Sequence, residues 1–160
     1  MIIPARKRIS AGFTLIELLI DIAILGILEA AVLVAVNPAK RQNQAKDANI
    51  KSDVGSIATA LQAYFTSPGQ GTYPTTLDTL VTNQDLVQLP VPPAGGAYDY
   101  TTLDAAGGVC DATPTDPCTK AVLYEPLFAP ATATYVWCWR SAAGRAAELA
   151  PPGVAGTCIP

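Results

Sequence analysis

Histidine is absent from the 160 residues of this chain, and charged residues make up only 14% of it. The chain therefore lacks the residue that most often serves proteins as a general base and as a metal ligand. Catalytic pairs of serine or cysteine with histidine are excluded, and the glycines form no phosphate-binding loop. We expect a protein that is not an enzyme and that uses no cofactor.

Basic residues are scarce after residue 12. The chain holds ten Lys and Arg against thirteen Asp and Glu, and three of the ten (Arg6, Lys7 and Arg8) precede that point. The remainder has seven basic and thirteen acidic side chains, a formal charge of −6. Such a balance gives no electrostatic basis for binding nucleic acid.

The hydrophobic residues, half of the chain, are distributed unevenly, and residues 13–36 are almost wholly apolar. At about 1.5 Å per residue, a helix of this length is long enough to span a bilayer. The small residues Ser10, Ala11 and Gly12 precede the run, whereas in a secretory signal peptide they would follow it. A cut at these residues would leave the apolar segment on the mature chain. By the positive-inside rule, the basic residues hold the N-terminal end in the cytoplasm.

This junction, Gly12-Phe13-Thr14-Leu15-Ile16-Glu17, resembles the class III signal of type IV pilins and pseudopilins. The resemblance implies that a prepilin peptidase cuts between Gly12 and Phe13 and that Phe13 becomes the N-methylated terminus. A carboxylate at the centre of a bilayer costs about 2.5–3.5 kcal/mol. We therefore expect Glu17 to pair with the terminal amine of Phe13 on a neighbouring subunit and to fix their register; the alternative is an acid tolerated near the membrane edge.

Two further acids, Asp21 and Glu29, are not explained by the resemblance. At 100° per residue they share an arc of about 120° with Glu17. The fifteen Leu, Ile, Val and Phe residues of the run offer roughly 4.5–9 kcal/mol of insertion energy, and three central acids would cost roughly 7.5–10.5 kcal/mol. Insertion is therefore marginal. The acids are protonated or near the interface, meet polar partners in a filament, or raise solubility.

A second helical pattern follows Asn37-Pro38, where the proline predicts a kink or a short unwound stretch. Apolar residues recur every three or four positions, which predicts an amphipathic helix ending at Ser67-Pro68-Gly69; they are Ile50, Val54, Ile57, Leu61 and Phe65.

A turn at residues 72–76 is expected to cap a short helix near 77–81. Strand patterns cover 98–103, 121–127 and 134–141, and the tail after Gly144 allows a further hairpin. We expect an α+β fold, in which a long N-terminal helix, apolar in its first half and amphipathic in its second, packs on an antiparallel sheet of three to four strands.

The four cysteines lie in the C-terminal third, which indicates two disulfides formed in an oxidising compartment. Of the three possible connectivities, Cys110–Cys118 with Cys138–Cys158 is favoured because each bond closes a loop rich in Pro or Gly. The spacings of the cysteines do not suit zinc.

Asp111 and Asp116 are a weak calcium candidate, because some major pseudopilins bind calcium in a loop; a solvated acidic turn is favoured. Trp137 and Trp139 are expected in the sheet core or at a subunit interface in preference to a ligand platform.

The resemblance implies an order of segments along the chain. Residues 1–12 are a leader, 13–36 a transmembrane and filament-core helix, 37–66 an amphipathic helix, and 67–160 a globular head with a disulfide-closed C-terminal loop.

It also implies a function, that of a structural subunit of a type IV pilus-like filament. Identical subunits, the prepilin peptidase, and the platform protein and ATPase of the assembly machine are the expected partners. The precursor would lie in the bacterial cytoplasmic membrane and the filament outside the cell. Two alternatives are a pseudopilin of a type II secretion or competence system and a singly anchored surface-binding protein that does not polymerise.

Overall fold

The computed structural model describes residues 12–111, 113, 115–152 and 158, except for the side chains of residues 34–36. It divides into two compact units, Met1–Arg41 and Gln42–Pro160, and each is described by itself. We call the second unit the body. The expected leader therefore lies, apart from Gly12, outside the described residues.

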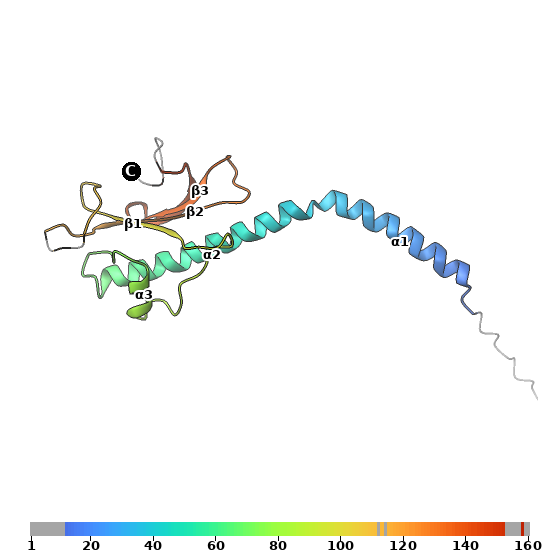
Figure 1. Cartoon of the computed structure of the whole chain (residues 1–160), viewed down its shortest axis with the longest axis horizontal. Coiled ribbons are helices and arrows are strands. Elements are labelled where there is room, and N and C mark those ends of the chain that lie inside the picture. The colour runs from blue at the N-terminus through green and yellow to red at the C-terminus, as the bar shows by residue number, and fades with distance from the viewer. Residues whose placement is uncertain (1–11, 112, 114, 153–157, 159–160) are drawn as a thin grey trace, which may run out of the picture. The chain divides into compact units, whose positions relative to one another are not determined.

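Helix α1 (Leu15–Val36) is the first helix along the chain (Figure 1). A side chain caps its first turn. Thr14 has an extended backbone, and its hydroxyl oxygen accepts the N–H of Glu17 at 3.3 Å. The helix ends at Val36, and the following residue, Asn37, has a left-handed φ of 43°, as is common after a helix. The carboxamide oxygen of Asn37 also accepts the N–H of Lys40 at 3.2 Å, so that this residue caps helix α2 (Pro38–Thr66) as well. The expected interruption at Asn37-Pro38 is thus present.

Among the described residues, no single helix combines the length and the hydropathy of a membrane span, whereas the bent pair Leu15–Leu33 and Pro38–Thr66 meets both criteria together.

Helix α2 contributes the centre of the body's core. Its apolar stripe is buried as predicted, with Ile50, Val54, Ile57 and Leu61 fully enclosed. The helix ends at Thr66, and the chain turns at Gly69. A side chain at position 69 would overlap the carbonyl of Thr72 and the ring of Tyr64, so the turn requires glycine.

Helix α3 (Asp78–Thr82) lies where a short helix was predicted, but its expected polar cap is wrong. The position before the helix is occupied by Leu77, which makes no capping hydrogen bond. Its side chain is instead buried in the core, so that apolar packing anchors the start of this helix. The Thr76 hydroxyl lies 3.2 Å from that of Thr79.

The sheet has four strands in the order β1-β2-β3-β4, and all neighbours are antiparallel. The strands are β1 (Asp99–Leu103), β2 (Lys120–Pro126), β3 (Val136–Arg140) and β4 (Arg145–Leu149). A single 3-10 turn, η1 (Ser141–Ala143), and Gly144 with φ 64° connect β3 to β4, which is the hairpin that the tail allowed. The predicted fold class is confirmed.

Both faces of the sheet are covered. Ala121, Leu123 and Trp139 point toward α2 and join its core. Val122, Val136 and Cys138 point the other way and pack with Leu103 and Cys158. This alternation is the period-2 pattern of a strand buried on both sides.

Candidate assembly site

The surface of α1 is apolar and uncovered. Every large apolar side chain between Phe13 and Leu33 is more than half exposed, from 51% for Leu19 to 79% for Leu15. Soluble monomers rarely expose a continuous apolar patch of more than a few hundred Å². A helix that is apolar on all sides is stable only where protein or lipid surrounds it. The unit that contains α1 therefore needs a partner.

Glu17 lies in the first turn of α1, where a negative charge is favoured by the helix dipole. Thr14 and Glu17 have the spacing of a capping box, a signal that the sequence analysis missed. The Thr14 hydroxyl lies 3.5 Å from a carboxylate oxygen of Glu17. This contact is long, so the carboxylate retains most of its capacity to accept hydrogen bonds from another molecule.

Asp21 and Glu29 are exposed on α1, and neither has a hydrogen bond or an ion pair within the described part of the chain. The three acids of α1 therefore differ. Glu17 belongs to a cap, whereas Asp21 and Glu29 have no role within the subunit that the structure describes.

At the expected cleavage junction, Gly12 and Phe13 are both exposed. A methyl group added at Gly12 would meet no atom within 4 Å. Folding of the described residues thus does not require glycine at this position. Ser10, Ala11 and the three basic residues before them (Arg6, Lys7 and Arg8) lie outside the described part of the chain.

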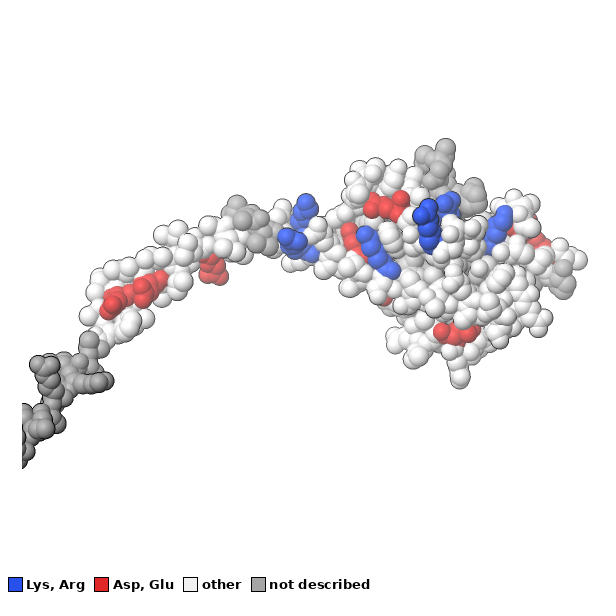
Figure 2. Space-filling model, turned by 180° about the vertical axis from the view of Figure 1, so that it is seen from behind, with Lys and Arg blue, Asp and Glu red and all other residues white. Residues whose placement is uncertain are grey.

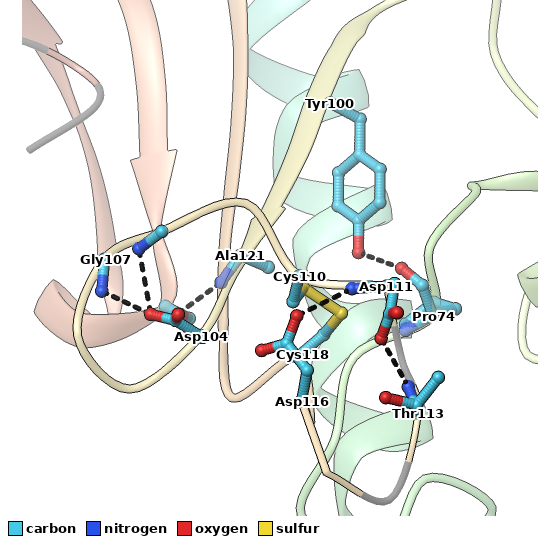
Figure 3. The surroundings of a disulfide bond; sticks show 12 residues. Pro74, Tyr100, Asp104, Gly107, Cys110, Asp111, Thr113, Asp116, Cys118 and Ala121 are labelled. Carbon is cyan, nitrogen blue, oxygen red and sulfur yellow. Dashed lines mark hydrogen bonds between the residues drawn. A yellow bond between two sulfur atoms is a disulfide. The ribbon is translucent and has the colours of Figure 1, made fainter.

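The cysteines form two disulfides, Cys110–Cys118 and Cys138–Cys158, which is the pairing favoured from the sequence. The first bond closes a loop in the segment between β1 and β2, and Cys118 lies two residues before β2 begins (Figure 3). The second bond ties Cys158 to β3, and the N–H of Cys158 donates to the carbonyl of Ala150 at 3.1 Å. Both cysteines of the second bond are buried.

The two acids considered for calcium are already engaged within their loop. A carboxylate oxygen of Asp116 accepts the N–H of Asp111, and that of Asp111 accepts the N–H of Thr113 at 3.0 Å (Figure 3). The Thr113 hydroxyl and N–H lower the pKa of Asp111. No group of three or more His, Cys, Asp or Glu residues suited to a metal ion occurs in the described part of the chain. The acidic turn, favoured over calcium from the sequence, stays a prediction.

The tryptophans belong to the body's interior. Trp139 is 2% exposed and packs edge-on against Tyr73, with ring centroids 6.3 Å apart. Trp137 is partly buried, and the ammonium group of Lys51 lies 4.7 Å from the centre of its ring.

Buried carboxylates between α2 and the sheet are the feature that the sequence analysis missed. Asp47 accepts the N–H groups of Phe128 and Ala129 at 2.7 and 2.9 Å, and so ties α2 to the loop between β2 and β3. Asp53 accepts the hydroxyl of Tyr98 at 2.7 Å. Asp47 lies three residues before Ile50, on the same stripe of the helix, and that spacing could have indicated its burial.

Glu125 on β2 is a second buried carboxylate, whereas Asp53 is half-buried. Burial and the nearby charge of Asp99 raise the pKa of Glu125 to about 7. Burial together with Asp53 raises the pKa of Tyr98.

Comparison with known proteins agrees with the apolar helix and its junction. Residues 7–35 match the family described as the prokaryotic N-terminal methylation motif. The chain belongs to the type IV pilin and pseudopilin family, whose members are structural subunits. It is 38% identical over 118 residues to the type II secretion system core protein G of Pseudomonas aeruginosa, an alignment that covers 64% of this chain and 80% of that relative. No solved structure matches the chain.

Proposed function

We propose that this chain is a subunit of a pilin-like filament, cut between Gly12 and Phe13 and polymerised through α1. The observation that carries the proposal is the exposure of every large apolar side chain from Phe13 to Leu33 on a helix that bears the family's processing motif. Before assembly, lipid would cover this helix and the precursor would be membrane-anchored. In the filament, the same surface would be covered by the helices of identical subunits.

Glu17 would set the register of that assembly. After cleavage, Phe13 would carry a positive amine, and Glu17 lies four residues further along the chain. A pair formed between subunits would give both charges a partner inside an apolar bundle, where an unpaired charge is costly. The prepilin peptidase, the platform protein and the ATPase of the assembly machine are the proposed partners.

Two types of filament are candidates, a type IV pilus and a type II secretion pseudopilus. The sequence alone favoured an extracellular type IV pilus. The relative at 38% identity is named as a core protein of type II secretion, which favours a pseudopilus that works in export across the cell envelope. We therefore retain both filaments as candidates, with the pseudopilus supported by this relative.

A test that separates these candidates uses complementation. The full-length chain is produced in bacteria that lack either the core protein G of type II secretion or the major type IV pilin. Restored export of secreted enzymes supports a pseudopilin, and restored surface filaments in electron micrographs support a pilin. A processed chain that restores neither, and forms no filaments when produced in excess, would instead be the singly anchored surface protein.

A further inference from the structure

Helix α1 carries more negative charge than its own segment of the chain can balance. Its three carboxylates are Glu17, Asp21 and Glu29, and no Lys, Arg or His occurs in residues 9–39. On the face of α1 that Figure 2 shows, red acidic side chains interrupt a white surface, and no blue side chain lies among them. After the proposed cleavage, the amine of Phe13 would be the one positive charge of this segment. Three negative charges against one positive charge leave each processed α1 with an excess of two carboxylates.

A bundle of identical parallel helices does not remove this excess. Every copy brings one amine and three carboxylates, so the excess grows with each added subunit. If Glu17 takes the amine, as proposed above, Asp21 and Glu29 are left without a positive partner on α1.

The next basic residue along the chain is too far away to serve adjacent copies. Lys40 lies eleven residues after Glu29. A register set by Glu17 and Phe13 shifts adjacent helices by four residues, which leaves Glu29 and Lys40 of adjacent copies seven residues apart. Seven residues of helix span about 10 Å, more than the Debye length of about 8 Å at physiological salt. Adjacent copies therefore do not neutralise these two acids.

Covering the apolar surface of α1 also covers both carboxylates. Leu25 lies four residues after Asp21 and four residues before Glu29, so the three side chains share one side of the helix. In the isolated subunit Leu25 is 62% exposed, and both acids are exposed without a hydrogen bond or ion pair within the described residues. Neighbouring helices that bury Leu25 remove water from the acids on either side of it. Burial without a positive partner favours the neutral, protonated form of a carboxyl group.

We propose that Asp21 and Glu29 take up protons from water when α1 enters the filament core, so that acid stabilises the filament and rising pH loosens it. The proposal rests on the polymerisation proposed above. A carboxyl group in water loses its proton above about pH 4. Because the assembled state then binds two protons more than the separated subunit, each pH unit above that point changes the assembly equilibrium by up to about a hundredfold, about tenfold for each carboxyl group.

Release of subunits from filaments at different pH tests this proton uptake. Sheared filaments from cells that produce the full-length chain are held in a mild nonionic detergent between pH 5 and 8. The subunits left in the supernatant after sedimentation are then measured. We expect release from wild-type filaments to rise at least tenfold over this range. In the double variant Asp21→Asn with Glu29→Gln, which removes both charges and keeps the side-chain shapes, release should change less than twofold. Each single substitution should give an intermediate dependence.

A control in the body separates this effect from other titrations. Asp78→Asn removes an exposed carboxylate of the body, and its filaments should keep the wild-type pH dependence. Glu125 has a pKa of about 7 and titrates over the same range. It is unchanged in all of these variants, so the difference between their release curves belongs to α1.

The outcomes distinguish this inference from the proposed function. Equal release curves for the wild type and the double variant would overturn the proton uptake alone. Loss of filaments in the double variant would also overturn it, because the charged carboxylates would then be required, as in pairing with Lys40 of a more distant copy. A wild type that forms no filaments at any pH would overturn the proposed function and this inference with it.

Discussion

Helix α1 and the body bury their apolar residues in opposite ways. In the body, Ile50, Ile57 and Leu61 are fully buried against the sheet of the same chain, whereas in α1 Ile16 and Ile27 are 65% and 72% exposed. The same residue types are present in both. The difference lies in pattern, because the body's helix has an apolar stripe that one sheet can cover, whereas large apolar side chains lie all the way around α1. A stripe can be buried within one subunit, while an apolar cylinder needs several neighbours.

The carboxylates of the body and of α1 also differ in whether the same chain supplies their hydrogen-bond donors. In the body, Asp47 and Asp53 are half or fully buried and have hydrogen-bond donors from elsewhere in the chain. On α1, Asp21 and Glu29 have none within the described residues. The body is therefore expected to respond to substitutions through its own stability, and α1 through processing and assembly.

The largest effect is expected at the junction. Replacement of Gly12 by a bulky residue such as leucine should leave the precursor uncut, because the peptidase must approach the backbone closely there. The body should fold normally, since a side chain at position 12 meets nothing in the described chain. Gly26→Ala, at another unobstructed glycine, is the control and should be cut. Immunoblotting for precursor and mature chain gives the answer, and efficient cutting of Gly12→Leu would contradict it.

The three acids of α1 are expected to differ. Glu17→Ala should leave cleavage and the body's melting temperature unchanged but strongly reduce sheared filaments, because the register pair is lost. Asp21→Val and Glu29→Ala should keep or improve assembly and strengthen membrane retention, because each removes an insertion cost of about 2.5–3.5 kcal/mol. Normal filaments from Glu17→Ala, with assembly lost in Asp21→Val, would assign the polar role to the other carboxylate.

Within the body, the disulfides should matter most. Replacing Cys138 and Cys158 by alanine should lower the free energy of unfolding by about 3 kcal/mol, and the shorter Cys110–Cys118 loop should cost slightly less, about 2.5 kcal/mol, in the loop-entropy account. Urea unfolding measures both. A peptide map under non-reducing conditions that links Cys110 to Cys138 would contradict the sheet and loop arrangement.

The buried carboxylate of α2 comes next. Asp47→Ala should destabilise the body by roughly 2 kcal/mol, because two backbone N–H groups lose a charged acceptor. Asp78→Ala is the control, since that carboxylate is exposed and should cost less than about 0.5 kcal/mol. Equal effects of the two substitutions would show that Asp47 does not tie α2 to the loop between β2 and β3.

The smallest effect concerns pH. The pKa of Glu125 is about 7 in the folded body and 4.5 in the unfolded chain, so the folded state holds the proton more tightly. The stability from this group is therefore full below pH about 4.5 and declines as the pH rises to about 7. Between pH 5 and 8, the melting temperature should fall further in the wild type than in Glu125→Gln. The same fall in both proteins would contradict the assignment.

The sequence predicted those features that depend on local pattern. The stripe from Ile50 to Phe65 and the alternation around Trp139 gave the core of the body, because side-chain periodicity decides which face is buried. The cap expected before α3 was wrong, because burial of Leu77 outweighed a polar cap. The hydrogen bonds of Asp47 and Asp53 were missed, because their donors lie far away in the sequence and only the fold brings them together. Strand register in particular cannot be read from any one strand.

The most direct test of the account is the intact mass of the subunit in sheared filaments. Assembly through a processed α1 predicts a chain that begins at Phe13, carries one N-terminal methyl group and lacks four hydrogen atoms at its two disulfides. A chain that keeps residues 1–12, or one that begins after Val36 and so has lost α1, would contradict it.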